Sequence, residues 1–291
     1  MSTNNDIFFT FLYTIDLLFS DYYYISNMND LQHLQKVILS IVKDIDELCR
    51  KNGIEYYLFG GSAIGAIRHK GFIPWDDDLD IVMNHNNYRK FVKVCREQLN
   101  PEKYYFQEGM VDWPALYSKV RLKGTFFEES ESFGENRDNK GIFVDVFKLD
   151  NAPNSSLLRK WQYFCGKSLL AYCLLQRGYR NASIKKKFLM YLSSPLKVRF
   201  FRSFFEYQVI RYNKREKNFY ASFGARFKYK NCFYKKELFS NPVYVPFEDT
   251  LLPVPNEYDE LLTQIYGDYM TPPPVKEQVG AHLKGIDFGV Y

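Results

Sequence analysis

Residues 58 to 83 read LFGGSAIGAIRHKGFIPWDDDLDIVM, and this stretch carries four aspartates within five positions. They are Asp76, Asp77, Asp78 and Asp80. Two like unit charges about 4 Å apart repel by roughly 4 kcal/mol at an effective dielectric near 20, so crowded carboxylates need a compensating cation. Hard oxygen ligands favour magnesium or manganese. The sequence therefore predicts a divalent metal site in this segment.

The residues from Asp78 to Val82 alternate charged and apolar side chains. This period of two predicts a strand with one buried face, from which Asp78 and Asp80 project on the same side. The alternative is an acidic, solvated turn after Pro74. A solvated turn does not explain why the acids continue into an apolar strand, so we expect metal ligands.

A glycine pair precedes the aspartates. The apolar run over residues 54 to 59 predicts a strand, and residues 59 to 62 (FGGS) close it before a short helical pattern over residues 63 to 68. A glycine pair at a strand-to-helix turn brings backbone N–H groups close to a phosphate, whose charge the helix N-terminus favours. Many turns share this pattern, but next to paired aspartates it predicts a site where a phosphate meets a metal.

A third carboxylate lies in another apolar segment, residues 141 to 147 (GIFVDVF). Asp145 interrupts this predicted strand, and an unpaired charge in a buried strand is energetically expensive. We expect Asp145 to be a metal ligand or a general base. The alternative is a salt bridge to a lysine or a position at a sheet edge.

Two basic residues alternate on a further predicted strand, residues 117 to 122. Lys119 and Arg121 would project from the same side of it. They would either reach a phosphorylated substrate or line a solvated strand face, and the pattern does not separate these two interpretations.

Three segments together resemble one family. They are residues 60–62 (GGS), 68–81 (RHKGFIPWDDDLDI) and 141–147 (GIFVDVF). They look like the LicD family of phosphotransferases, which belongs to the nucleotidyltransferase-fold superfamily and is related to the fukutin group. The closing segments 253–258 (PVPNEY) and 266–274 (YGDYMTPPP) are similar to it too. The resemblance runs from about Leu31 to His282, with little of it in residues 155 to 236.

The resemblance implies a metal-dependent transfer of a phospho-alcohol group, such as phosphocholine, from a CDP-linked donor to a sugar hydroxyl of a cell-surface glycan. CMP would be released, and the acceptor would be a teichoic acid, capsule or lipopolysaccharide precursor, lipid-linked in some cases. Asp78 and Asp80 would hold Mg²⁺ or Mn²⁺, and Asp145 would complete the metal shell or take the acceptor's proton. Catalysis would consist of positioning and charge neutralisation at phosphorus.

The resemblance also implies donor-binding residues. Arg68, His69 and Lys70 would neutralise diphosphate charge, Arg68 in a bidentate way. Asp76 would be a further ligand or a neighbour of the metal shell. The predicted substrate-binding residues are Gly60, Gly61, Ser62, Arg68, His69, Lys70, Asp76, Lys119 and Arg121.

Two rival functions stay open at this point. One is a nucleotidyltransferase that moves the nucleoside monophosphate itself to a small molecule or glycan, because the same fold permits both reactions. The other is an inactive module that binds a glycan or nucleotide. Retention of Asp78, Asp80 and Asp145 argues against the inactive module. The donor alcohol, whether choline, ribitol, glycerol or another, is not decided by the sequence.

Composition predicts a folded protein in a reducing compartment. Of the 291 residues, 46% are hydrophobic and 18% aromatic, which excludes global disorder. The five cysteines are odd in number and have no C-x-x-C spacing, so we expect free thiols and a cytoplasmic protein. Four scattered histidines indicate no zinc site.

Four segments are expected along the chain. Residues 1–27 contain three aspartates and no lysine or arginine, and their apolar run is too short to span a bilayer. They resemble no secretory signal, so we expect a dispensable extension. Residues 28–154 would form the nucleotidyltransferase-like catalytic core. Residues 155–240 would form a basic, aromatic, helical region, and residues 241–291 would pack back on the core.

Charge is distributed unevenly. The chain has a net charge of +5, yet residues 155 to 236 hold 20 lysines and arginines against only two glutamates, Glu206 and Glu216. Ser194-Pro195 predicts a helix start, after which aromatic and basic residues recur at helical spacing. Such a helix would lie on an anionic membrane, at the inner face of the cell membrane, or bury its rings in the core. No RNA-binding motif accompanies it, so we expect no nucleic-acid partner.

The predicted architecture is α/β, of the α+β type: a nucleotidyltransferase-like mixed sheet flanked by helices, with a basic, mainly helical insert. Predicted helices cover residues 31 to 51 and 87 to 98, and the insert covers about 155 to 235. Predicted strands cover residues 54 to 59, 79 to 83, 104 to 108, 117 to 122 and 142 to 147.

Overall fold

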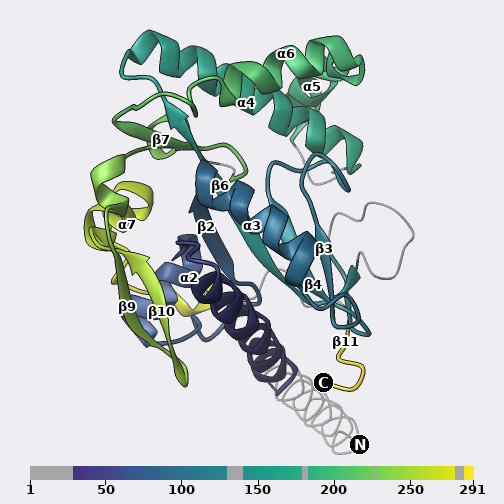
Figure 1. Cartoon of the computed structure of the whole chain (residues 1–291), viewed down its shortest axis with the longest axis vertical. Coiled ribbons are helices and arrows are strands. Elements are labelled where there is room, and N and C mark those ends of the chain that lie inside the picture. The colour runs from purple at the N-terminus through teal and green to yellow at the C-terminus, as the bar shows by residue number, and fades with distance from the viewer. Residues whose placement is uncertain (1–28, 130–139, 179–182, 226, 279–284) are drawn as a thin grey trace, which may run out of the picture.

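The computed structural model describes residues 29–129, 140–178, 183–225, 227–278 and 285–291 (Figure 1). The N-terminal extension predicted for residues 1–27 lies outside the described residues. A long first helix occupies residues 29–51. The remaining longer helices are α3 (His85–Gln98), α4 (Ser156–Gln176), α5 (Ile184–Leu192), α6 (Arg199–Ile210) and α7 (Tyr258–Tyr266). Short helical turns are α2 (Gly60–Ile64), which runs into a π-helical turn (Gly65–His69), and 3₁₀ turns at Ser194–Lys197, Tyr229–Asn231, Lys236–Phe239 and Val275–Glu277.

The strands form one large sheet and two small ones. The seven-stranded sheet has the order β1-β2-β6-β4-β3, with β7 beside β6 and β8 beside β7. Its strands are β1 (Tyr57–Leu58), β2 (Asp80–Asn84), β3 (Tyr104–Gln107), β4 (Ser118–Leu122), β6 (Phe143–Ala152), β7 (Phe219–Ser222) and β8 (Phe233–Lys235). The two-stranded sheets pair β9 (Pro242–Phe247) with β10 (Thr250–Pro255), and β5 (Phe126–Phe127) with β11 (Ile286–Asp287).

The large sheet is mixed. β2 and β6 run parallel, whereas the other pairs within it are antiparallel. A parallel pair needs a crossover connection, and here the chain between β2 and β6 passes through α3, β3 and β4. This arrangement, with helices on the flanks, confirms the predicted α+β class.

The register of the three central strands aligns charged residues. Asp80 of β2 pairs with Asp145 of β6, and Asp145 pairs in turn with Lys119 of β4. Because side chains alternate along a strand, neighbours such as Ile81 and Val146 point to the opposite face. One face of the sheet is therefore apolar at this level, and the other carries a row of charges.

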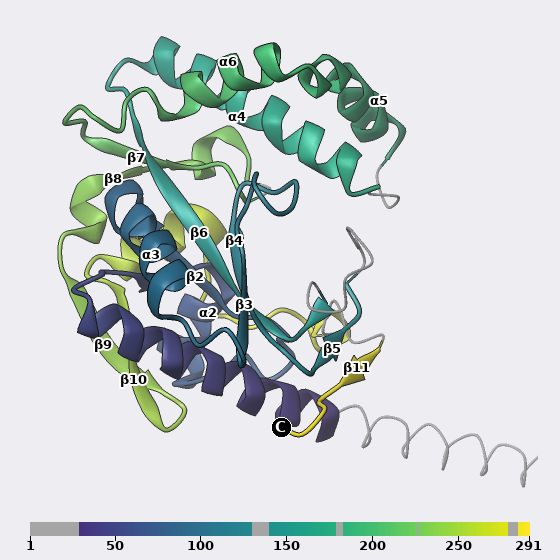
Figure 2. The same ribbon diagram turned by 45° about the vertical axis from the view of Figure 1, so that its right-hand side comes forward.

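Each face of the sheet has its own cover. The apolar face packs on the first helix and on α3, through residues such as Ile41, Ile45 and Phe91. Figures 1 and 2 show these two helices lying across the same side of the strands. The other face is covered by α7 and the turn at Lys236–Phe239, beyond the charged row. The charged row thus lies beside a packed core and not on a free surface.

The basic region is only partly the helical insert that we predicted. Helices α4, α5 and α6 form a layer at one end of the molecule (Figure 2). After Ile210, however, the chain forms β7 and β8 and joins the main sheet through β6. The predicted helical stretch to residue 235 is therefore too long, because the apolar residues of β7 complete the sheet instead of a helix face.

Several helices and strands begin or end at other residues than predicted. The strand expected over residues 54 to 59 shortens to β1, since the chain turns into α2 at Gly60, whose φ of +60° favours glycine. The helix expected at Ser194-Pro195 is a 3₁₀ turn, and α6 begins at Arg199. Asp78 precedes β2 and does not lie in it. Asp78 and Asp80 therefore share a site without sharing a strand face.

The five cysteines are free and buried, as the absence of paired spacing indicated. Among the described residues, no helix combines the length and the apolar character needed to cross a bilayer.

Candidate active site

Three aspartates form an acidic cluster that could hold a metal ion. One carboxylate oxygen from each of Asp76, Asp77 and Asp78 lies within 4.8 Å of the others. Asp77 is buried and had no role in our prediction, which placed Asp78 with Asp80 and Asp145 instead. The irregular segment before β2 explains the difference, because three consecutive residues outside a strand can direct their carboxyl groups to one point. A strand would separate them.

Burial and repulsion within the cluster raise the pKa values of Asp80 and Asp76 most clearly. Burial and the neighbouring Asp78 raise the pKa of Asp76 to about 8. Burial, followed by Asp78 and Asp145, raises the pKa of Asp80 well above its ordinary value. Asp78 is thus the neighbour that both groups share. A cation among these carboxylates would relieve the repulsion.

Asp145 is paired with a lysine, which was the alternative to its role as a metal ligand or base. Lys119 Nζ lies 2.8 Å from Asp145 Oδ1 and 3.0 Å from Glu129 Oε1. Lys119 Nζ also lies 3.2 Å from the centroid of the Phe143 ring, a cation–π contact. Burial still raises the pKa of Asp145, although Lys119 opposes the shift. The salt bridge therefore orients Asp145 without removing it from the acidic site.

Arg121 is fully engaged by the protein. Its Nε donates to Gln107 Oε1 (2.8 Å), Nη1 to the carbonyl oxygen of Gly141 (3.0 Å) and Nη2 to Glu129 Oε2 (2.6 Å). Arg121 is only 1% exposed, so it lines neither a solvated face nor an open donor pocket. It holds Glu129, and Glu129 in turn holds Lys119. Sequence reasoning missed Glu129, because nothing in its local pattern separates it from an exposed loop acid.

The Gly-Gly-Ser turn lies directly against the aspartates. Ser62 Oγ accepts a hydrogen bond from the backbone N–H of Asp80 (2.8 Å). A Cβ atom on Gly61 would lie 3.0 Å from Asp76 Oδ2, and one on Gly60 would lie 3.4 Å from Asp80 Oδ2. Both glycines thus let the turn approach the carboxylates. Phosphate binding by this turn stays a prediction.

The two side chains at the start of the RHKGFIP loop contact each other. Arg68 Nη1 donates to the carbonyl oxygen of Tyr269 (2.6 Å), and Arg68 Nε donates to His69 Nε2 (2.9 Å). Burial and the adjacent Arg68 lower the pKa of His69. A ring whose Nε2 accepts a hydrogen bond is neutral, so His69 does not supply the positive charge that we predicted for it.

The rest of that loop is held from two sides. Glu248, at the tip of the β9–β10 hairpin, accepts from the N–H of Phe72 (3.0 Å) and donates its own N–H to the carbonyl of Lys70 (2.8 Å). Gln35 of the first helix donates to the carbonyl oxygens of Ile73 (3.2 Å) and Asp76 (2.8 Å). The Lys70 side chain is exposed. The loop is therefore a fixed wall of the site.

The sequence left two interpretations of Tyr266, the end of a helix or a direct part in the active site. It is the last residue of α7, and Gly267 follows with a φ of +78°. Its hydroxyl oxygen would lie 3.3 Å from a Cβ atom on Gly60. Burial and the charge of Asp80 raise the pKa of the hydroxyl. Both interpretations of the segment hold, since the helix stops where its last side chain reaches the acids.

The donor set fits a divalent cation. The five aspartates that converge here offer carboxylate oxygen, the ligand that Mg²⁺ and Mn²⁺ prefer. Oxygen atoms within 4.8 Å of one another are close enough to share an ion. Asp78 is central, Asp76 and Asp77 lie beside it, and Asp80 with Asp145 extends the group onto the sheet.

Comparisons with known proteins identify the relatives of this chain. Residues 53–169 match the LicD/FKTN/FKRP nucleotidyltransferase domain. A lipopolysaccharide cholinephosphotransferase, LicD of Haemophilus influenzae, is 30% identical over 275 residues, which cover 87% of this chain and 96% of the relative. The ribitol 5-phosphate transferase FKRP of Mus musculus is 29% identical over 108 residues, which cover 37% of this chain and 19% of the relative. An uncharacterized protein of Rickettsia prowazekii is 32% identical over 119 residues, 40% of each chain.

Proposed function

The chain belongs to the LicD family, and on this premise we propose that it transfers a phospho-alcohol group, phosphocholine first among them, from a CDP-linked donor to a sugar hydroxyl of a cell-surface glycan. CMP is the second product. The Haemophilus relative, similar over nearly its whole length, is named for choline phosphate transfer to lipopolysaccharide. The mouse relative is named for ribitol 5-phosphate transfer. Both names describe a phospho-alcohol, which is why we choose this class of donor group.

The observation that carries the proposal is the alignment of Asp80, Asp145 and Lys119 across three strands, beside Asp78 and the Gly-Gly-Ser turn. We assign Asp78 and Asp80 as ligands of Mg²⁺ or Mn²⁺, with Asp145 as the third ligand and Asp76 as a close neighbour. The ion, when bound, supplies positive charge for the donor diphosphate. Lys119 fixes the orientation of Asp145, and Arg121 fixes that of Glu129.

The turn and the loop serve the donor in this proposal. Gly60, Gly61 and Ser62 present backbone N–H groups to a donor phosphate. Arg68 and Lys70 add positive charge at the loop, where Arg68 is already held by the carbonyl of Tyr269. Tyr266 closes the site from the side of α7, so its hydroxyl is placed to contact a substrate oxygen near Asp80.

We place the enzyme at the inner face of the cell membrane on the strength of the layer α4–α6. Its outward residues include Trp161 and Phe164, which stack, and Phe204, all well exposed. Arg199 and Arg202 lie among them on α6. Exposed aromatic rings beside arginine and lysine are the features of a helix that lies in the interface of an anionic bilayer. A lipid-linked acceptor would be met on that surface.

The test is CMP release from a panel of CDP-choline, CDP-ribitol and CDP-glycerol, with Mg²⁺ or Mn²⁺ and a lipid-linked sugar extract as acceptor. We expect one donor to be turned over by the wild type and none by Asp78→Asn. If no CDP-alcohol is consumed while a nucleoside triphosphate yields pyrophosphate, the protein is a nucleotidyltransferase and the proposed substrate class is wrong. If neither occurs, the inactive binding module is the better interpretation.

A further inference from the structure

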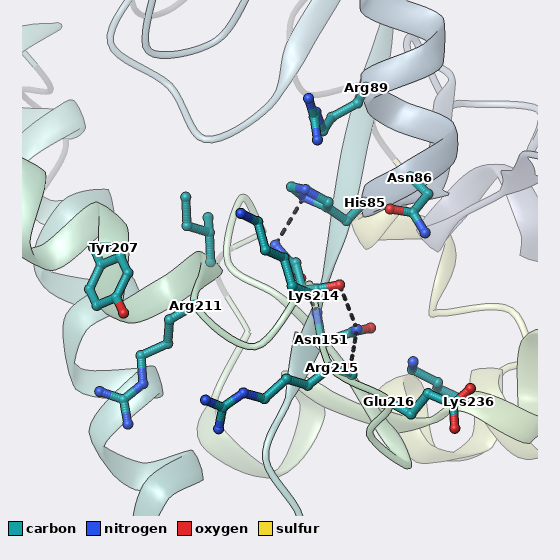
Figure 3. Close-up of a pocket in the computed structure, with 12 residues that line it drawn as sticks. His85, Asn86, Arg89, Asn151, Tyr207, Arg211, Lys214, Arg215, Glu216 and Lys236 are labelled. Carbon is teal, nitrogen blue, oxygen red and sulfur yellow. Dashed lines mark hydrogen bonds between the residues drawn. The ribbon is translucent and has the colours of Figure 1, made fainter.

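A polar cavity lies away from the acidic site. Its volume is about 870 Å³, and it opens between the start of α3 and the end of α6 (Figure 3). Its wall includes His85, Arg89, Lys214 and Arg215. Arg211 and Lys236 add two more basic side chains, and Glu216 is the only acid in the lining. The cavity is therefore strongly cationic.

Three of these cations are available to a ligand. Arg89, Lys214 and Arg215 are exposed, and within the described part of the chain their side chains have no ion-pair partner. Arg211, by contrast, donates to Gln208 (2.7 Å) and to the hydroxyl of Tyr212 (2.8 Å). Figure 3 shows Arg89 extending from α3 on one side of the cavity, with Lys214 and Arg215 on the other side. The free charges thus lie on opposite walls of one cavity.

The floor of the cavity is rigid. Asn151 of β6 donates from its side-chain amide to the carbonyls of Tyr212, Asn213 and Arg215, and its own N–H donates to Asn213 Oδ1 (2.6 Å). This clamp holds the turn that carries Lys214 and Arg215. The basic side chains therefore extend from fixed backbone.

Beneath the turn, His85 is oriented by buried groups. Its Nδ1 lies 2.9 Å from Asn213 Nδ2 and 3.4 Å from Asp150 Oδ1, and Asp150 is buried. Because Nδ1 is engaged, Nε2 is the ring nitrogen that a ligand in the cavity would meet. Lys148 Nζ, 3.3 Å from Asp150, balances the buried carboxylate. The protein thus places one more polar contact at the base of the cavity.

This cavity is separate from the acidic site. Asp80 begins β2 and His85 follows its end, so roughly 16 Å of strand lies between them at about 3.3 Å per residue. On β6, Phe147 and Leu149 lie between Asp145 and Asn151, and both are packed in the core with Tyr234. A single donor molecule at the aspartates is therefore walled off from the cavity along this face.

The exposed stripe of α6 leads to the cavity. Phe200, Phe204 and Tyr207 recur at helical spacing and are 75%, 46% and 58% exposed. Tyr207 and the next exposed apolar residue, Ile210, line the cavity. The anion site thus opens beside the apolar surface that would meet a bilayer.

We propose that the cavity binds the phosphate groups that join a saccharide acceptor to its lipid at the membrane surface. The ligand chemistry is a phosphate or diphosphate, which arginine recognises with paired donors and lysine with a point charge. Only the identity of the acceptor rests on the proposed function, since the anion site follows from charge, shape and position.

The experiment measures binding by the full chain to inorganic pyrophosphate and to phosphatidylcholine vesicles with or without a polyprenyl diphosphate. The test variant is Arg89→Gln with Lys214→Gln and Arg215→Gln. The matched control is Lys36→Gln with Lys51→Gln and Lys276→Gln, three exposed lysines elsewhere. We expect about a tenfold or larger loss of affinity for both probes in the test variant and none in the control. Glu216→Gln, which removes the only acid in the lining, should tighten binding.

Asp80→Asn separates this inference from the proposed function. It should bind pyrophosphate like the wild type in the absence of metal, and a clear gain of affinity, caused by the loss of a negative charge beside the anion, would place the anion at the aspartates instead. Unchanged affinity in the triple variant would overturn the inference even if CMP release confirms the enzyme. Binding of pyrophosphate alone, without a gain from polyprenyl diphosphate in vesicles, would overturn the lipid-linked source. Tighter binding of a single-stranded RNA oligomer than of either probe would overturn the ligand class.

Discussion

In the acidic site, charged side chains are buried and held against one another, whereas in the layer of α4, α5 and α6 they stand in water beside exposed aromatic rings. Asp145, Lys119 and Arg121 are nearly inaccessible, and each is bound by a neighbouring charge. Phe200 and Phe204 are exposed, and the basic residues around them, such as Lys197, have no comparable network. Both regions are rich in charge, but only the first one fixes its geometry.

The difference indicates that the charged residues of the two regions serve different functions. Buried charges destabilise a fold unless each is paired, so the protein retains them where exact positions serve chemistry. Exposed basic and aromatic residues contribute little to folding and attract an anionic partner over a distance. We therefore expect substitutions in the acidic site to alter catalysis and stability strongly. Substitutions in the helical layer should alter association alone.

The largest expected effect is the loss of catalysis in Asp80→Asn. CMP release should fall by about a thousandfold or more, because a metal ligand and part of the charge at phosphorus are lost. The metal-free variant should be more stable than the metal-free wild type, since burial and Asp78 disfavour the charged form of Asp80. Activity assays and thermal melting measure both. Asp249→Asn, at the exposed hairpin tip, is the control, and wild-type activity in Asp80→Asn would refute the site.

Metal removal should affect the acidic site and leave the function of the helical layer unchanged. A chelator should abolish CMP release and lower the melting temperature, because a bound ion offsets repulsion among Asp76, Asp78 and Asp80. At a hundredfold excess over its Kd, a ligand that binds only the folded state adds about 2.7 kcal/mol. Vesicle binding should be unaffected. Activity that survives exhaustive chelation would contradict the metal assignment.

Lys119→Met should lower the free energy of unfolding more than any of the other substitutions. Removing one partner of a buried ion pair costs about 3–5 kcal/mol, because Asp145 and Glu129 then lose their cation. Urea denaturation measures the loss, which should be accompanied by lower activity. Lys43→Met, which breaks an exposed ion pair with Asp249, is the control and should leave the midpoint nearly unchanged. Equal denaturation midpoints for the two variants would contradict the expected difference between buried and exposed ion pairs.

The smallest effect on the fold is expected for Phe200→Ser with Phe204→Ser. Both rings are exposed, so stability should change by less than about 0.5 kcal/mol per site. Binding to anionic vesicles should fall several-fold, and the remaining binding should be sensitive to salt. Vesicle co-sedimentation and turnover of a water-soluble acceptor are the measurements. A large loss of stability would mean that the rings belong to the core.

The local patterns predicted much of the fold but missed several strands, among them the two of one hairpin. The hairpin β9–β10 was not expected, because prolines at 242, 246, 253 and 255 argue against strands. In a two-stranded sheet every strand is an edge, so the missing N–H groups leave few ladder bonds broken. Glu248 at its tip holds the RHKGFIP loop. A part of the site wall therefore came from a segment whose composition predicted a loop.

In the candidate site, too, the sequence indicated some of the residues and missed others. The glycines and aspartates of residues 60 to 80 and Asp145 were recognisable, because charge within an apolar pattern needs an explanation. Glu129 and Gln35 were not, since each is an ordinary loop or helix residue until the chain folds. The position of Asp77 in the cluster was not predicted either. The alternating pattern from Asp78 predicted a strand there, whereas β2 begins only at Asp80.

By itself, the amino-acid sequence determined the class of the fold and the family, and it indicated the acids of the candidate site, since periodicity and motif chemistry act over a few residues. The tertiary structure alone decided which charges meet: that Asp80, Asp145 and Lys119 lie in register, and that Glu129 completes the network. It also decided that Arg89 and Lys214 face one cavity. These pairings join residues far apart in the chain, and their energies depend on burial, which no local pattern specifies.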